Sequence, residues 1–200
     1  PIMYWGNPDA SVSFCEDKYN VLPYVAEYYN TMSAISYLIV GLILKNFTKL
    51  NKISNSILFL GIGTMLLHGT LRKYGQWVDE CGMLSFSYDV IVELRRRRNK
   101  TTNYLYFVAL IGSYFMLVKF HFFVLLFLGL QLYIYVLSNK SYKNTRDKLL
   151  VKSYAGVFVV SMVLWFLDQF YCSYTKNYQL HALWHVGTSL SILLGCLTLI

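Results

Sequence analysis

Charged residues are scarce in this sequence. Only 14% of its 200 residues are Asp, Glu, Lys or Arg, whereas roughly 25% is usual for a soluble domain. Hydrophobic residues make up 56% of the chain. This combination excludes an ordinary soluble domain and predicts a protein that crosses a membrane several times.

Proline is also rare, with three in the chain, and neither a proline-rich or serine-rich linker nor an internal repeat is found. We therefore expect one domain over residues 1–200. The sequence before the first apolar stretch lacks a charged region, a short apolar region and a small-residue cleavage site in that order. No removable signal peptide is therefore predicted.

Seven stretches approach the ~20 residues that a helix needs to cross a bilayer. They predict an all-α fold, a bundle of seven transmembrane helices, preceded by an N-terminal segment at residues 1–27. The third stretch is the least apolar, because it contains four carboxylates, but the charge pattern of the loops is consistent only if it spans. The predicted spans are 28–46, 53–71, 77–94, 101–118, 120–138, 153–172 and 178–200.

The basic residues predict the orientation of this bundle, because loops rich in Lys and Arg stay in the cytosol. One side carries thirteen: Lys45, Lys49, Lys52, Arg95, Arg96, Arg97, Arg98, Lys100, Lys140, Lys143, Arg146, Lys148 and Lys152. The other side carries five: Lys18, Arg72, Lys73, Lys119 and Lys176. We therefore expect the N-terminus on the luminal or extracellular side and the C-terminus in the cytosol.

The same pattern explains the net charge of +8. The clusters lie between apolar stretches, so they predict topology and argue against a nucleic-acid partner. The run Arg95–Arg98 is interpreted as a cytosolic stop signal. Binding of anionic lipid headgroups is a lesser alternative for that run.

Histidine is scarce as well, with four in the chain. The predicted topology places His68, His181 and His185 at the luminal ends of two spans. His181 and His185 are four residues apart, so they share one face of a helix. His121 stands alone at a short turn, and we assign it no role.

Further polar residues are predicted at the same depth: Thr64, one turn before His68, Asp79 and Asp168. Ionisable groups in a span cost roughly 2.5–3.5 kcal/mol on insertion scales, so their convergence indicates a functional site. Three neutral imidazoles suit zinc, with water as its fourth ligand. Asp79 would orient that water or accept its proton, and Thr64 would donate a hydrogen bond to a developing oxyanion. A transmembrane haem, or a proton relay through Asp89 or Asp168, is the alternative.

The chain has only four cysteines. The predicted topology places Cys15 and Cys172 on the same, non-cytosolic side, where an oxidising lumen would allow them to form a disulfide. Such a bond would tie the N-terminal segment to the helices. Cys81 and Cys196 lie in or near apolar stretches and are predicted to be inert packing residues.

Four motifs, in chain order, resemble those of one family. They are YWGNPDASVSFCEDKYNVLPYVAEYYNT, TMLLHGTLRKYGQWVDE, WFLDQFYC and HALWH. The sequence resembles the alkaline ceramidases, a branch of the seven-helix membrane hydrolases that includes the adiponectin-receptor-like and Per1-like proteins. The likeness covers nearly the whole chain.

The resemblance implies zinc held by His68, His181 and His185, water activated by Asp79, and hydrolysis of the amide of ceramide to a sphingoid base and a fatty acid. The family's usual serine is here Thr64. The resemblance also implies an endoplasmic reticulum or Golgi membrane, with the site facing the lumen and ceramide and the bilayer as partners. Three alternatives remain open: another lipid hydrolase or receptor-like member of this superfamily, a non-catalytic relative, and a zinc-storing membrane transporter.

The family also has a calcium site near the N-terminus, and here the sequence departs from it. Glu16, Glu27 and the carbonyl of Phe14 correspond to ligands, but the aspartate position is Ser13 and the asparagine position is Lys18. An ammonium opposes the anionic oxygen shell that calcium needs. Either the Lys18 ammonium occupies the place of the ion between Glu16 and Glu27, or Lys18 points to solvent and calcium binds weakly. The residues available for that weak binding are Asp17 and Asn20.

Overall fold

The computed structural model describes residues 3–117 and 119–200, and these contain helices and no β-strand. The predicted N-terminal segment is therefore seen from Met3, and Val118, the last residue of the predicted span 101–118, lies outside the described residues. The α-helices are α1 (Tyr28–Ser33), α2 (Ile35–Lys45), α3 (Asn51–Thr70), α4 (Lys73–Arg96), α5 (Leu105–Met116), α6 (Phe120–Asn139), α7 (Thr145–Phe170), α8 (Cys172–Thr175) and α9 (Leu180–Leu197). Two short 3₁₀ helices are η1 (Thr48–Leu50) and η2 (Lys176–Tyr178).

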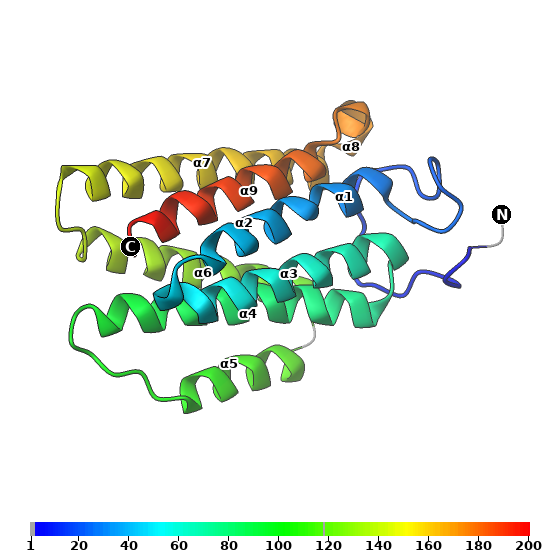
Figure 1. Cartoon of the computed structure of the whole chain (residues 1–200). Coiled ribbons are helices and arrows are strands. Elements are labelled where there is room, and N and C mark those ends of the chain that lie inside the picture. Colours follow the sequence, from blue (N-terminus) through cyan, green and yellow to red (C-terminus); the bar gives the residue numbers. More distant parts are fainter. Residues whose placement is uncertain (1–2, 118) are drawn as a thin grey trace.

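The long helices lie roughly along one direction (Figure 1). Helix α3 packs against α4, α7 packs against α9, and α2 contacts both α3 and α9. The N-terminal segment lies at the end of the bundle where α1, α4 and α9 begin and α3 ends. One end of the bundle therefore gathers residues from widely separated parts of the chain.

Glycines allow α3 and α4 to approach closely. A Cβ at Gly63 would lie 2.7 Å from the backbone nitrogen of Asp79, and one at Gly82 would lie 2.7 Å from the Cα of Leu60. Side chains at these two positions would force the helices apart. Their absence brings Thr64, beside Gly63, within reach of Asp79.

The all-helical membrane fold predicted from the sequence agrees with the structure. Among the described residues, four helical stretches are long and apolar enough to cross a membrane: Thr48–Thr70, Phe120–Asn139, Thr145–Phe170 and Leu180–Leu197. Helix α4 has the necessary length but carries buried carboxylates, which lower its mean hydropathy. The count of seven spans and the orientation of the termini stay predictions.

The first predicted span, 28–46, is two helices and not one. Helix α1 ends at Ser33 and α2 begins at Ile35, with Ala34 between them. Helix α5 has only 12 residues, about 18 Å at 1.5 Å per residue. That length falls short of the ~30 Å hydrocarbon core, so 101–118 was predicted too long.

Helix α7 begins at Thr145, eight residues before the predicted start. The side chain of Asn144 accepts the N–H of Asp147 at 2.8 Å, which caps the helix. The predicted cytosolic loop after 120–138 is therefore shorter, because its residues Arg146, Lys148 and Lys152 are helical.

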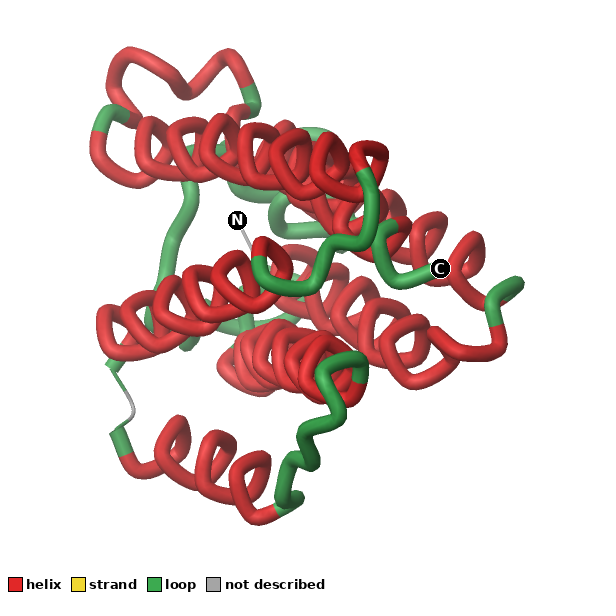
Figure 2. The backbone as a smooth tube through the Cα atoms, turned by 90° about the vertical axis from the view of Figure 1, so that its left-hand side faces the viewer, coloured by secondary structure: helices red, strands yellow, loops and turns green. Residues whose placement is uncertain are grey.

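The outer helices expose apolar side chains. Leu125 and Leu132 of α6 and Val159 and Val163 of α7 are each more than half exposed. Helix α5 lies at the edge of the molecule, apart from the bundle (Figure 2), and contacts α4. A continuous exposed apolar surface of this kind is expected to face lipid.

Candidate metal centre

Three buried imidazoles form what we call the histidine cluster. His68 lies in the last turn of α3, whereas His181 and His185 lie in the first turns of α9. Their ring centroids are 4.7–4.9 Å apart, and one potential ligand atom from each lies within 4.8 Å of the other two. All three side chains are at most 1% exposed. The sequence prediction that they converge at one depth therefore matches this geometry.

Nitrogens of this cluster have no hydrogen-bond partner among the described residues. These are both ring nitrogens of His181 and Nε2 of His185. Buried polar groups in proteins are nearly always paired, so unpaired ones need an explanation. Convergent imidazole nitrogens are ligands for a transition metal, and the donor set fits such an ion.

Two polar side chains orient the rings from behind. Nδ1 of His68 is 2.6 Å from Oε2 of Glu27, and Nδ1 of His185 is 2.7 Å from Oγ of Ser33. Such second-shell contacts fix the tautomer of a histidine and direct its other nitrogen at the metal. The sequence analysis assigned Glu27 to a calcium site and did not identify Ser33. Their positions on either side of α1 are the only sequence signal that could have suggested them.

Thr64 and Asp79 form a hydrogen-bonded pair beside the cluster. Oγ1 of Thr64 donates to Oδ1 of Asp79 at 2.5 Å and also lies 2.9 Å from the carbonyl oxygen of Leu60. Asp79 and His181 line the same small cavity. The threonine hydroxyl thus contacts the carboxylate in this structure, and its predicted donation to an oxyanion stays a prediction.

Phe14 covers the cluster from the N-terminal segment. Its ring centroid is 3.8 Å from that of His181 and 4.8 Å from that of His68. The side chain is buried and lines the same cavity as Asp79. An aromatic ring in this position limits the access of bulk water to the imidazoles. The sequence analysis considered only the carbonyl of this residue.

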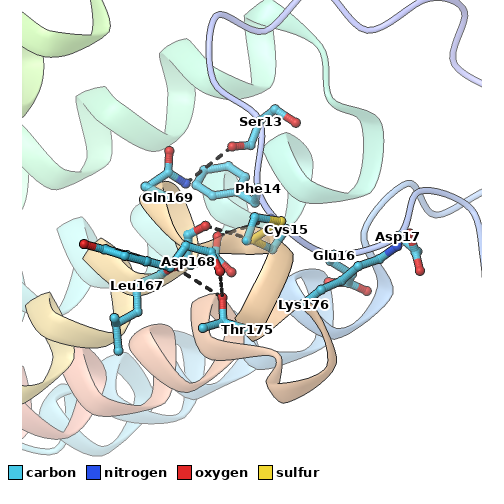
Figure 3. Close-up of a disulfide and its surroundings, with 12 residues drawn as sticks. Ser13, Phe14, Cys15, Glu16, Asp17, Leu167, Asp168, Gln169, Thr175 and Lys176 are labelled. Atoms are coloured by element: carbon cyan, nitrogen blue, oxygen red, sulfur yellow. Dashed lines mark hydrogen bonds and ion pairs between the residues drawn. A yellow bond between two sulfur atoms is a disulfide. The ribbon is translucent and has the colours of Figure 1, made fainter.

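The predicted pair Cys15 and Cys172 is joined in a disulfide beside the phenylalanine (Figure 3). The N–H of Cys15 also donates to Oδ2 of Asp168 at 3.2 Å. Asp168 was predicted in the layer of the histidines, and the structure places its carboxylate on the N-terminal segment. Both contacts hold this segment against the end of α7.

Contacts with α4 hold the other half of the segment. Oδ1 of Asp9 accepts the first N–H of α4, that of Lys73, at 2.6 Å, and Oε1 of Gln76 accepts the N–H of Ser11 at 2.7 Å. Arg72 forms an ion pair with Asp9 at 3.1 Å. The segment is therefore tied to the bundle along most of its length.

A second polar cluster, here called the lysine cluster, consists of Lys18, Glu27 and the backbone carbonyls of Phe14 and Glu16. Nζ of Lys18 donates to the carbonyl oxygens of Phe14 and Glu16 at 2.7 and 2.9 Å, and to Oε1 of Glu27. The carboxylate of Glu16 does not contact the ammonium but accepts the N–H groups of Tyr29 and Asn30 at 2.7 and 2.8 Å. It therefore caps α1.

Burial and charge act in opposite directions on the two carboxyl groups. Burial raises the pKa of Glu16, and the hydrogen bonds from Asn30 and Tyr29 offset this only in part. Burial would also raise the pKa of Glu27, but the hydrogen bond and charge of His68 and the charge of Lys18 outweigh it and lower that pKa. Glu27 therefore stays a carboxylate.

The remaining residues considered for calcium lie elsewhere. Asp17 pairs with Lys176 at 2.7 Å, Asn20 is exposed, and the exposed Ser13 contributes its carbonyl to Gln169 at 3.4 Å. An ammonium and a divalent cation would compete for the same oxygens. The residues present therefore do not fit calcium at this position.

Other candidates from the sequence lie away from the histidine cluster. His121 is exposed at the start of α6. Asp89 accepts a hydrogen bond from Ser56. In the run Arg95–Arg98, the side chain of Arg97 donates to the carbonyl of Thr198 at 2.9 Å and so caps the end of α9. Cys81 and Cys196 are free thiols, the first half-buried and the second buried.

Known proteins match the chain over most of its length. The model of the Ceramidase family matches residues 6–200. An alkaline ceramidase of Arabidopsis thaliana is 30% identical, over 93% of this chain and 81% of the relative. A putative alkaline ceramidase of Dictyostelium discoideum, dcd3A, is 24% identical over 94% of this chain and 84% of its own length, and alkaline ceramidase 1 of Mus musculus is 25% identical over 95% and 79%. The resemblance found in the sequence is thus confirmed, and the chain belongs to the ceramidase family.

Proposed function

We propose that this protein is a zinc-dependent membrane hydrolase that cleaves the amide of ceramide into a sphingoid base and a free fatty acid. The observation that carries the proposal is the histidine cluster, with its buried unpartnered nitrogens, in a chain that belongs to the ceramidase family. Bound zinc would polarise the amide carbonyl and lower the pKa of a water molecule to near 7.

The chain's own residues would supply the proton transfers. The Asp79 carboxylate takes one proton from the water as its oxygen attacks the carbonyl carbon. It returns that proton to the amide nitrogen as the C–N bond breaks, so the products are a fatty acid and an amine. The hydroxyl of Thr64, bonded to Oδ1, holds the carboxylate in position and leaves Oδ2 free for the proton.

An apolar cavity next to the metal centre supports a lipid substrate. It has a volume of about 580 Å³ and lies between α4, α6, α7 and α9. Trp184 and Thr188, which follow His181 and His185 on α9, line it, and most of the remaining lining side chains are aliphatic or aromatic. A hydrocarbon chain fits this lining, because it has no polar group to satisfy.

The proposed location is a membrane of the secretory pathway, with the metal centre facing the lumen. The Cys15–Cys172 disulfide supports it, because disulfides persist in oxidising compartments and this one lies at the same end of the bundle as the histidines. The asymmetry of the basic residues agrees with this orientation.

Purified full-length protein in lipid nanodiscs would test the proposal. The measurements are zinc content and release of fatty acid from a panel of N-acyl sphingoid bases. His185→Ala is the test variant, and His121→Ala is the matched control because His121 is exposed and outside the cluster. We expect one zinc per chain and hydrolysis in the wild type and the control, and loss of both in His185→Ala.

Two results would overturn the proposal. Zinc-loaded wild-type protein that releases no fatty acid from any member of the panel would refute the hydrolase. Full zinc occupancy in His185→Ala would refute the ligand set.

A further inference from the structure

The lysine cluster has the geometry of a cation site that the chain fills by itself. Three oxygen atoms, two backbone carbonyls and one carboxylate, converge on Nζ of Lys18. Glu27 is fully buried, whereas the Lys18 side chain is 27% exposed. A buried carboxylate without a cationic partner is strongly unfavourable. The ammonium supplies that partner from within the N-terminal segment.

Glu27 connects this ammonium to the histidine cluster. One of its oxygens, Oε1, accepts from Lys18, and the other, Oε2, contacts Nδ1 of His68 at 2.6 Å and the side-chain amide of Asn30 at 3.1 Å. The carboxylate is therefore held by partners on both oxygens. Its position fixes the orientation of the His68 ring, as second-shell carboxylates do.

The same ammonium also fixes the residue that covers the site. It binds the carbonyl of Phe14, whose ring lies over His181 and His68. One side chain thus contacts both the second shell of the metal centre and the backbone of its cover. A change at Lys18 should affect both together.

We propose that Lys18 is a positioning residue whose ammonium takes the place of a divalent ion, so that the N-terminal segment closes over the metal centre and His68 is oriented without calcium. This inference rests on the metal site proposed above. Its converse is specific: removal of the ammonium leaves a set of oxygens of the kind that bind calcium. The variant should therefore need calcium where the wild type does not.

Three full-length proteins in nanodiscs test this: the wild type, Lys18→Ala and the matched control Lys176→Ala. Lys176 also pairs with the N-terminal segment, through Asp17, but at an exposed position. The readouts are zinc affinity by competition with a chelating dye, binding of radioactive calcium, and fatty-acid release. Each is measured with and without millimolar calcium, and zinc content is checked in every sample.

We expect the wild type and Lys176→Ala to bind no calcium and to show the same zinc affinity in both conditions. Lys18→Ala should lose about 10- to 100-fold in zinc affinity, the usual effect of disturbing a second-shell partner. Calcium should bind to this variant and restore the zinc affinity. If Lys18→Ala does not purify as folded protein, Lys18→Gln keeps the length of the side chain without its charge, and the same results are expected.

The proposal is overturned if the wild type binds calcium or loses zinc affinity when calcium is removed. Equal zinc affinity of Lys18→Ala and Lys176→Ala would also overturn it. Failure of the proposed function gives a different result, namely no fatty-acid release from zinc-loaded wild type. In that case the zinc and calcium measurements on Lys18→Ala still decide the role of Lys18.

Discussion

The histidine cluster and the lysine cluster are neighbours that share one carboxylate, yet their chemistry is opposite. The first consists of neutral rings whose inward nitrogens include unpartnered ones. The second consists of oxygens, one of them charged, that are already satisfied by an ammonium. Glu27 contacts Lys18 with one oxygen and His68 with the other.

This difference shows how a donor set indicates whether a cation must come from outside. Neutral imidazoles tolerate burial without a counter-ion, but their free nitrogens lack partners and so favour an external metal. A buried carboxylate cannot remain unpaired, and here a lysine in the same chain satisfies it. The two clusters therefore predict opposite responses to added or removed metal.

The largest expected effect comes from changing the chemistry beside the histidine cluster without touching its nitrogens. Asp79→Asn should lower fatty-acid release by at least about 100-fold, because general acid–base catalysis typically contributes that much. Zinc content should not change. Asp89→Asn, the same change on the same helix next to Ser56, is the control and should keep its activity. Comparable activity in Asp79→Asn and the control would exclude Asp79 as the proton acceptor.

A change at the shared carboxylate tests the link between the clusters. Glu27→Gln keeps an acceptor for His68 but removes the charge that pairs with Lys18. Zinc affinity should fall by about 10- to 100-fold. Glu93→Gln, a buried carboxylate paired with Arg96 at the far end of α4, should leave zinc affinity unchanged. Equal zinc affinities of the two variants would show that the clusters are independent.

The disulfide tests whether the N-terminal segment is needed to keep the two clusters in contact. Cys15→Ser should lower stability by about 2–4 kcal/mol and the melting temperature with it. Cys172→Ser and the double variant should show the same decrease, because each breaks the same bond. Cys81→Ser, which changes a free thiol, is the control. An unchanged melting temperature in Cys15→Ser would mean that the bond does not hold the segment.

The smallest effect is expected at Thr64. Thr64→Ser keeps the hydroxyl that binds Asp79 and should leave the rate of fatty-acid release almost unchanged. Thr64→Ala removes the hydrogen bond, worth about 0.5–1.5 kcal/mol, and should slow the reaction by about 2- to 10-fold. A rate for Thr64→Ala equal to that of the wild type would show that Asp79 needs no support from residue 64.

The convergence of the histidines was predictable because helix ends and loop charges constrain depth. His68 at the end of one span and His181 and His185 at the start of another have to lie at the same level if both spans cross the bilayer. Asp79 follows from the same argument. The helix α4 that carries it escapes a hydropathy test, because its carboxylates are buried against other helices.

Contacts made by the N-terminal segment were less predictable. Its residues before Glu27 have no helical period, so the sequence does not show which side chain faces the bundle. The ring of Phe14 over His181 and the contact of Asp168 with Cys15 depend on that path. The bond between Ser33 and His185 depends on the break at Ala34, which no proline or glycine marks.

The most direct test of the central claim is fatty-acid release from ceramide by one preparation before zinc removal, after it, and after zinc is returned. Zinc content is measured at each step, and the melting temperature shows whether the protein stays folded. We predict that hydrolysis falls with the zinc content and returns with it, at one zinc per chain. Zinc-free, folded protein that cleaves ceramide at the untreated rate would contradict the account.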